Sequence, residues 1–352
     1  MRNRRIEPLQ KEIHASLVLP SGQLVTMPVS IRRCPLTNIT SRITPARPLQ
    51  KLSSAPLVVP PSTTNNAGCP FCEPQVWSAT PTFPKEFAPT PRLSKGTSLI
   101  FPNISPYGAH SAVLLLSLDH YIPMGCFSVP QYQDTLTNSQ QYLTLVAHKD
   151  PEAHFVAITQ NILPSSGGAL VHPHLQVNAD SDPMGYHRAL LNSCQEWDGK
   201  LGGVQGPDGS HLLSTWAAQE SDGPRFVATS GPWTLAAAYA PAAQEEFHLF
   251  YTGKEWSLQS LNEGSCQELA RLVVLVQRFW HSRGFNSGHL VLLLSTRAHH
   301  PPMARLLLRA TYEPWYRNDQ SCYEVGCWEP SRDVSPEQLA QATRSFSAST
   351  EW

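Results

Sequence analysis

The stretch Ser165-Ser-Gly-Gly-Ala-Leu-Val-His-Pro-His-Leu-Gln-Val-Asn178 decides how the rest of this chain is interpreted. If it forms an extended strand, its side chains alternate between two faces, so His172, His174 and Gln176 project from the same face. Two imidazoles and a carboxamide directly after a Gly-Gly turn can coordinate a metal, grip a phosphate or present a nucleophilic nitrogen. A half-exposed polar face without any such role fits the segment equally well, so the surrounding sequence has to decide.

Length and composition exclude several classes of protein. The 352 residues suffice for one large domain or two ordinary ones. A formal net charge of −1 gives no electrostatic reason to expect nucleic-acid binding. No apolar run reaches the roughly 18 residues that span a bilayer. The basic N-terminus is not followed by the apolar segment of a secretory signal. We therefore expect a cytoplasmic protein that binds neither nucleic acid nor membranes.

The cysteines point to one metal clip. Of the eight cysteines, which are dispersed along the chain, only Cys69 and Cys72 have the spacing of metal ligands. A tight turn in Gly68-Cys-Pro-Phe-Cys-Glu73 puts both sulfurs on one side, where they can reach one tetrahedral zinc. A redox pair is the alternative, but no βαβ pattern of the thioredoxin type surrounds it. The remaining ligands must come from elsewhere, and His120, just beyond a buried strand predicted at 111–117, is one candidate.

Hydrophobic periodicity predicts two similar α+β halves, because strands, a helix and further strands occur in the same order twice. Residues 1–33 are expected to form an irregular arm with one short strand at 16–19, and 48–66 a surface loop. The halves are assigned to 34–200 and 201–352. Strands are predicted at 98–103, 111–117, 153–160, the His-Pro-His segment, 225–229, 233–239, 246–251, 289–294 and 305–310, and helices at 128–148, 183–196, 263–282 and 335–346.

These motifs together resemble a known family. Cys69-x-x-Cys72, Asp119-His120, Asn161, Gly167-Gly168 and His172-Pro-His-Leu-Gln176 follow one another as in the galactose-1-phosphate uridylyltransferase branch of the histidine-triad (HIT) superfamily. The resemblance extends over about 34–346. Outlying segments carry it further: Pro35-Leu-Thr with Arg47 resembles the phosphate-binding segment, Phe101-Pro-Asn103 the nucleoside-contacting strand, and Val325-Gly326 with Arg332-Asp333 and Pro336-Glu337 the C-terminal end.

The resemblance implies an α+β fold of two HIT-like halves, each an antiparallel sheet with packed helices. It also implies nucleotidyl transfer with ping-pong kinetics: His174 attacks an α-phosphorus, and Gln176 and Asn161 assist at the transferring phosphate. The partners would be a nucleotide sugar or other nucleoside polyphosphate and a phosphorylated acceptor, in a possible homodimer. The second half lacks the histidine motif. The remaining implied roles are structural zinc at Cys69, Cys72, His120 and His172, and substrate binding by Arg47, Asn103, Gly167, Gly168, Val325 and Gly326.

Several residues depart from the family pattern. A family serine is replaced by Ala169, and a second arginine by Gln50. After Asn103 the chain lacks the family's acidic residue, and after Gly326 its Tyr-Glu pair. A second metal site of some members is altered: Glu246 matches one ligand, but Leu307 and Arg309 replace histidines. Nucleotidyl transfer is therefore favoured over galactose as the acceptor. The alternatives are a phosphorylase or hydrolase of dinucleoside polyphosphates or nucleotide sugars, and a non-catalytic nucleotide-binding scaffold.

Overall fold

A computed structural model describes most of the chain, namely residues 5–44, 59–200, 211–297, 299–309, 311–312, 317–318, 320 and 322–350. The predicted phosphate-binding Arg47 and the neighbouring Gln50 lie outside these residues. The predicted boundary between the halves adjoins the segment 201–210, which is also outside them, and it stays a prediction.

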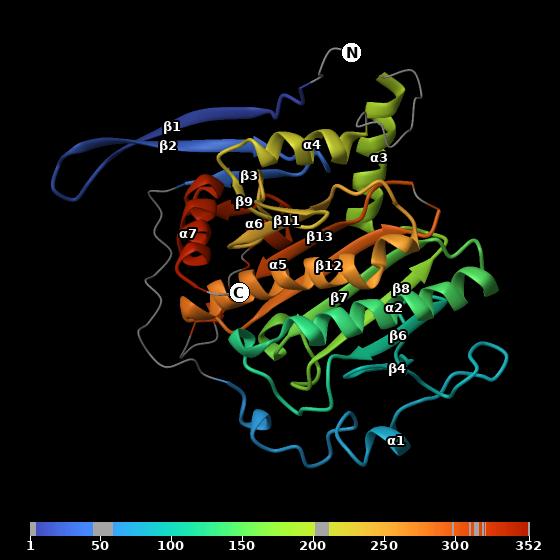
Figure 1. The fold of residues 1–352 in the computed structure, drawn as a ribbon. Helices are drawn as coiled ribbons and strands as arrows, with labels where there is room; N and C mark the ends of the chain where they lie inside the picture. Colours follow the sequence, from blue (N-terminus) through green and yellow to red (C-terminus); the bar gives the residue numbers. More distant parts are fainter. Residues whose placement is uncertain are drawn as a thin grey trace.

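One antiparallel sheet of ten strands forms the centre of the molecule, in the order β4-β5-β6-β8-β7-β12-β13-β11-β10-β9 (Figure 1). Its strands are β4 (Leu93–Lys95), β5 (Ser98–Pro102), β6 (His110–Leu115), β7 (Phe155–Ile162), β8 (His174–Asp180), β9 (Phe226–Ser230), β10 (Trp233–Ala237), β11 (Glu246–Tyr251), β12 (Gly288–Ser295) and β13 (Met303–Leu308).

The sheet is built from two five-stranded units of the same topology. Each unit runs through three strands, a long helix and two strands, with α2 (Val129–Lys149) in the first and α5 (Glu263–Ser282) in the second. The units meet edge to edge where β7 pairs antiparallel with β12. The expected α+β fold of two similar halves, each an antiparallel sheet with packed helices, is confirmed, and the two halves share one continuous sheet.

The helices α2 and α5 lie side by side on one face of the sheet (Figure 1). They cover the largest core cluster, which includes Leu114, Leu175, Ile158, Leu292 and Leu306 from the strands. α5 buries residues all around its middle because α2, the sheet and α7 (Pro336–Ala348) pack against it.

A buried hydrogen-bond chain joins the two units. The Tyr132 hydroxyl donates to Gln160 Oε1 at 2.7 Å and accepts from Gln277 Nε2 at 2.6 Å. It therefore connects α2, β7 and α5 beneath the junction of the halves.

The opposite face of the sheet is covered only at its two ends. At the first-unit end, Phe71 and Val76 pack on Leu99, Phe101 and Leu115. At the other end, the cover is α3 (Gly185–Lys200) and α4 (Leu212–Ser221), packed on β10, β11 and β13. Between these ends some side chains of β8, β7 and β12 on this face are only partly buried. At this central strip the face of the sheet is accessible to solvent.

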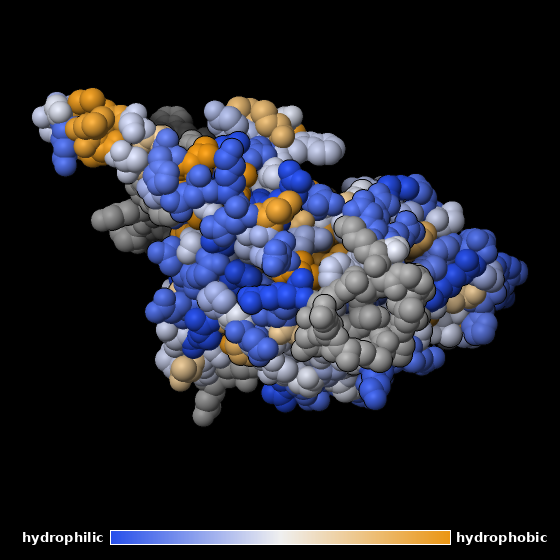
Figure 2. All heavy atoms as spheres, turned by 90° about the horizontal axis from the view of Figure 1, so that it is seen from above, coloured by the Kyte–Doolittle hydropathy of each residue, from blue (hydrophilic) through white to orange (hydrophobic). Residues whose placement is uncertain are grey.

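The N-terminal arm differs from the irregular segment that the sequence predicted. It is a long hairpin of β1 (Gln10–Val18) and β2 (Leu24–Arg33), continued by β3 (Thr40–Ile43) and β16 (Ser331–Arg332) as a four-stranded sheet. The hairpin projects from the body, and apolar side chains gather at its tip (Figure 2). Val18 is 63% and Leu24 68% exposed there. Both faces of β1 meet solvent, so its sequence lacks the alternation by which a strand is recognised.

The smaller elements complete the chain. They are α1 (Val76–Ala79), α6 (Cys322–Val325), the hairpin β14 (Thr311–Tyr312) and β15 (Arg317–Asn318), and 3-10 turns at Pro61–Thr63, Met124–Cys126, Pro164–Ser166 and Leu258–Leu261. None of the helices in the described segments has the length and apolar character needed to cross a bilayer.

Candidate functional site

Four potential metal ligands converge at the first-unit end of the sheet. The ligand atoms of Cys69, Cys72, His120 and His172 all lie within 4.8 Å of one another. The cysteines come from the turn before α1, His120 follows β6, and His172 precedes β8. The cluster could hold a metal ion in the tetrahedral N₂S₂ arrangement typical of zinc.

Both histidines are oriented for this role by main-chain carbonyls. The Nε2–H of His172 donates to the Ser117 carbonyl at 3.0 Å, and that of His120 donates to the Ser62 carbonyl at 2.7 Å. In the neutral ring, Nδ1 then carries the lone pair, and it faces the Cys72 sulfur, at 3.4 Å from His172 and 3.2 Å from His120. A hydrogen bond on the far nitrogen is the usual way in which a metal-binding histidine is fixed.

The electrostatics of the cluster also suit a cation. Burial lowers the pKa of His172 to about 4, which keeps its imidazole neutral. Burial, together with Cys69, raises the pKa of Cys72 to about 11. A positive charge beside the Cys72 thiol would favour its ionisation, and a metal ion held by the cluster would supply that charge.

His174, the first residue of β8, presents one unprotonated nitrogen. Its Nδ1–H donates to the main-chain carbonyl of His172 at 2.8 Å, so the proton is held there and Nε2 has a free lone pair. Burial lowers the pKa of His174, which favours the neutral ring. Phe71, between the two cysteines, packs edge-on against this ring with 5.3 Å between centroids. The turn that carries Cys69 and Cys72 thus contacts the imidazole of His174 directly.

Gln176 and Asn161 lie on the same face of the sheet as His174. Gln176 follows two residues later on β8 and pairs with Thr159 of β7. One residue further along the same register, Asn161 stands opposite His174. Its Oδ1 accepts a hydrogen bond of 2.8 Å from Nδ1 of His289 on β12. Four polar side chains on three adjacent strands therefore form one patch.

The Gly-Gly turn between β7 and β8 needs both of its glycines. Gly167 has φ +86°, a left-handed conformation that side chains disfavour. A Cβ on Gly168 would lie 3.1 Å from the Leu163 carbonyl oxygen. The turn can therefore fold back closely on the end of β7.

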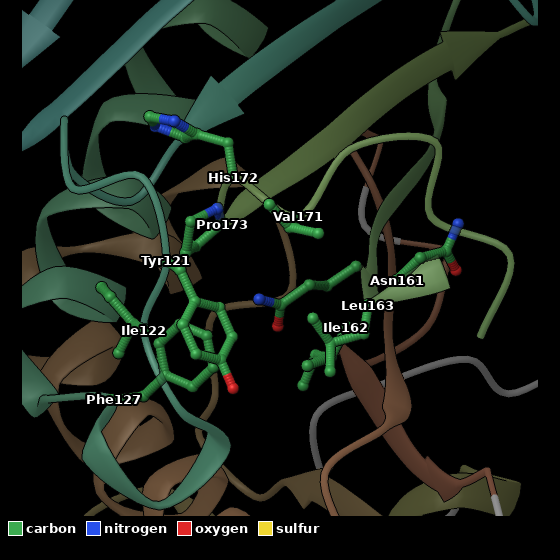
Figure 3. Close-up of a pocket in the computed structure, with 10 residues that line it drawn as sticks. Tyr121, Ile122, Phe127, Asn161, Ile162, Leu163, Val171, His172 and Pro173 are labelled. Carbon is green, nitrogen blue, oxygen red and sulfur yellow. The ribbon is translucent and has the colours of Figure 1, made fainter. Parts of the chain in front are cut away.

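A small pocket lies beneath this turn, on the helix side (Figure 3). His172 and Pro173 border it, together with Tyr121, Phe127 and Leu163. Asn161 turns its carboxamide away from the other lining side chains. The carboxamide is therefore directed out of this pocket, in keeping with its bond to His289.

Comparison with known proteins identifies the fold. No family model matches the chain. An uncharacterised protein of Archaeoglobus fulgidus is 24% identical over 311 residues, covering 87% of this chain and 89% of the relative. The structure of an ADP-glucose phosphorylase from Arabidopsis thaliana with bound ADP-glucose superposes with a TM-score of 0.67 at 15% identity, covering 90% of this chain and 98% of that one. A uridylyltransferase mutant gives a TM-score of 0.64 at 18% identity, covering 92% and 99%. The chain therefore has the same fold as these phosphorylase and uridylyltransferase structures.

Within this uridylyltransferase-like fold, the predicted substrate-binding residues are placed unequally. Asn103 directly follows β5, and its buried Nδ2 has no hydrogen-bond partner. Val325 ends α6 and is 66% exposed, and Gly326 follows it. None of the contacts among the described residues joins these two to the patch around His174. They stay predictions, as does Arg47.

Glu246, which the sequence matched to one ligand of a second metal site, is paired with an arginine. The carboxylate of Glu246, 1% exposed, binds Arg305 Nη2 at 2.6 Å and His248 Nε2 at 3.0 Å. Leu307 lies beside Glu246 on β13, as the paired register shows. The Arg305 guanidinium thus neutralises this carboxylate.

Sequence reasoning missed His289 as the partner of Asn161 and Phe71 as a neighbour of His174. The phenylalanine could have been found, because it lies between the two cysteines of the metal loop. The histidine could not, because only the pairing of β12 with β7 brings it to Asn161.

Proposed function

We propose that this protein is a nucleotidyltransferase that passes a nucleoside monophosphate group through a covalent intermediate on His174. The observation that carries the proposal is the hydrogen bond from His174 Nδ1–H to the His172 carbonyl, which leaves Nε2 unprotonated on the accessible face. A neutral imidazole held in this way is a competent nucleophile at neutral pH.

The reaction has two displacements at one phosphorus. The Nε2 lone pair of His174 attacks the α-phosphorus of the donor, the P–O bond to the leaving phosphate breaks, and that oxygen departs with the electron pair. A phosphate oxygen of the acceptor then attacks the same phosphorus, and the P–N electrons return to Nε2. Throughout, the proton stays on Nδ1, which donates it as a hydrogen bond to the His172 carbonyl, and the carbonyl dipole offsets the positive charge that develops on the ring.

Gln176 and Asn161 are proposed to act on the transferring group. Their carboxamides lie on the face of His174, two residues along β8 and one strand away. Their NH₂ groups can donate to the non-bridging oxygens, where charge accumulates in the transition state. Gly167 and Gly168 leave room for the phosphates by keeping the turn free of side chains.

A structural zinc ion is proposed at Cys69, Cys72, His120 and His172. When bound, it would crosslink the loop before α1 to the start of β8 and supply no open coordination position. His172 offers its imidazole to this site and its main-chain carbonyl to His174. Zinc bound to the His172 imidazole would therefore also hold the His172 carbonyl in place. This carbonyl is the hydrogen-bond acceptor that keeps the proton of His174 on Nδ1.

A nucleotide sugar is the donor class that the comparisons favour, since the phosphorylase neighbour is described with bound ADP-glucose. Two classes of acceptor for the nucleotidyl group are proposed as alternatives. A sugar phosphate would make the protein a uridylyltransferase-like enzyme, whereas inorganic phosphate would make it a phosphorylase. The lost Tyr-Glu pair after Gly326 weakens hexose recognition and gives the phosphorylase weight. By resemblance, we also propose a homodimer, which sedimentation velocity would test.

The test is intact-protein mass spectrometry at neutral to alkaline pH, because phosphoramidates are acid-labile. The metal-loaded protein is mixed with UDP-, ADP-, GDP-, CDP- and TDP-sugars and with dinucleoside polyphosphates. We expect a mass increase of one nucleoside monophosphate with one donor class. Discharge by inorganic phosphate, by a sugar phosphate or by water alone then separates phosphorylase, transferase and hydrolase. A scaffold would bind nucleotide without forming an adduct.

A further inference from the structure

The second half of the chain contributes a side chain to the candidate site, although it lacks the histidine motif. His289 is the second residue of β12, and the β7–β12 register puts it directly opposite Asn161. Asn161 is in turn opposite His174, one residue beyond the β7–β8 register. His174, Asn161 and His289 therefore occupy neighbouring strands in one row across the sheet, on the face that remains partly exposed.

The bond between Asn161 and His289 has a defined direction. The distance from His289 Nδ1 to Asn161 Oδ1 is 2.8 Å. A carboxylate or carboxamide oxygen can only accept, so the ring nitrogen is the donor. The ring remains neutral because burial, and then the charges of Arg309 and Arg305, lower its pKa to about 4. Its single N–H is consequently committed to Asn161.

This bond selects one of the two orientations of the Asn161 carboxamide. The group is planar, and its oxygen and nitrogen point to opposite sides of the Cγ atom. With Oδ1 held on His289, the NH₂ group is turned away from β12. Without that donor, a half-exposed carboxamide can rotate by 180° and present an oxygen where a donor is required.

We propose that His289 is a positioning residue for nucleotidyl transfer, which acts by fixing the Asn161 carboxamide so that its NH₂ group faces the phosphoryl oxygens at His174. The inference rests on the proposed function. It gives the second half of the chain a part in the reaction. The nucleophile and the proposed metal ligands come from the first half. His289, which orients the Asn161 NH₂ group that donates to the phosphate, comes from the second half.

Single-turnover kinetics of adduct formation test this inference, with donor affinity measured separately. His289→Ala should slow formation of the adduct by ~10- to 100-fold, the range for a lost hydrogen bond that acts at the transition state. Donor affinity should change much less. Asn161→Ala should cause a similar loss, and the double variant should be no slower than the slower single variant.

Two further variants separate positioning from packing. His289→Asn keeps an N–H donor close to the position of Nδ1 and should restore most of the rate, whereas His289→Leu fills the space without a donor and should not. Val291→Ala, two residues along the same face of β12, is the matched control and should leave the rate unchanged. Thermal unfolding of every variant reports whether the fold is retained.

The outcomes distinguish the inference from the function beneath it. A wild-type rate in His289→Ala, additive losses in the double variant, or equal rates in His289→Asn and His289→Leu would each overturn the role of His289 and leave His174 as the nucleophile. Absence of any adduct in the wild-type protein would overturn the proposed function and this inference with it.

Discussion

Replacement of Arg305 by methionine should strongly destabilise the protein, because it strands a buried carboxylate. Glu246 is 1% and Arg305 8% exposed, and two guanidinium nitrogens bind Oε1, Nη2 at 2.6 Å and Nε at 2.8 Å. The guanidinium also lies 3.8 Å from the centre of the Tyr186 ring. Burial alone would raise the pKa of Glu246, but the charge of Arg305 and the bond from His248 outweigh it, so the pKa falls below its usual value.

The size of the effect follows from this burial. Removal of one member of a buried ion pair costs about 3–5 kcal/mol, since the remaining charge is neither solvated nor paired. Methionine fills much of the volume, so little of the loss comes from a cavity. In a Glu246→Gln background the same replacement leaves no unpaired charge, because it removes the Arg305 cation that this background strands, and it should cost about 1 kcal/mol or less.

Urea denaturation at pH 7 of the wild type, both single variants and the double variant measures this difference as a coupling free energy. The cost of Arg305→Met should also shrink as the pH falls, because the stranded carboxyl has a raised pKa and becomes neutral by protonation. A loss below about 1 kcal/mol, or the same loss in both backgrounds, would refute the assignment of Arg305 as the charge partner of Glu246.

Three further predictions concern the metal, the acceptor and the response to pH. Cys69→Ser, or a strong chelator, should remove bound zinc and lower the thermal midpoint; unchanged zinc content by elemental analysis would rule out the clip. Gln176→His should shift discharge of the adduct from phosphate towards water, as in hydrolytic triad proteins, and an unaltered product ratio would contradict that role. The buried rings of His187 and His300 are 2.7 Å apart at Nε2, and burial first, with neighbouring histidines, lowers their pKa values to about 3 and about 4. The unfolded chain therefore binds more protons than the folded chain between pH 6.5 and 4. The free energy of unfolding should decrease as the pH falls through that window, by about 2 kcal/mol per histidine at pH 5. A free energy of unfolding that stays constant over this window, and is the same in His187→Gln, would exclude this effect.

The Cys/His cluster could be predicted from the sequence in part because some of its geometry is local, while the family resemblance supplied the full set of four residues. Two cysteines at a spacing of three share a turn, and alternate residues of one strand share a face, so short-range geometry brings the chemistry close together. His120 required the additional premise that it follows a buried strand, and β6 satisfies it.

The remaining features depend on long-range pairing or lack a pattern. His289 meets Asn161 only through the antiparallel register of β7 and β12, which no local periodicity encodes. α4 was not predicted, although its apolar residues Leu212, Leu213, Trp216 and Ala217 share one face, because the helix is short and Glu220 falls on the same buried face. The hairpin of β1 and β2 was missed because it lies largely outside the core, where hydrophobic alternation is not required.

The central claim is that His174 Nε2 becomes covalently bonded to the nucleotide. The most direct test is to isolate the protein after reaction with a productive donor, digest it at alkaline pH and map the modified peptide by mass spectrometry, with His174→Ala as the control. The account predicts one nucleoside monophosphate on the peptide that contains His174, and none in the variant even though its zinc content is unchanged. An adduct on another residue, or no adduct from any donor with the zinc-loaded protein, would contradict it.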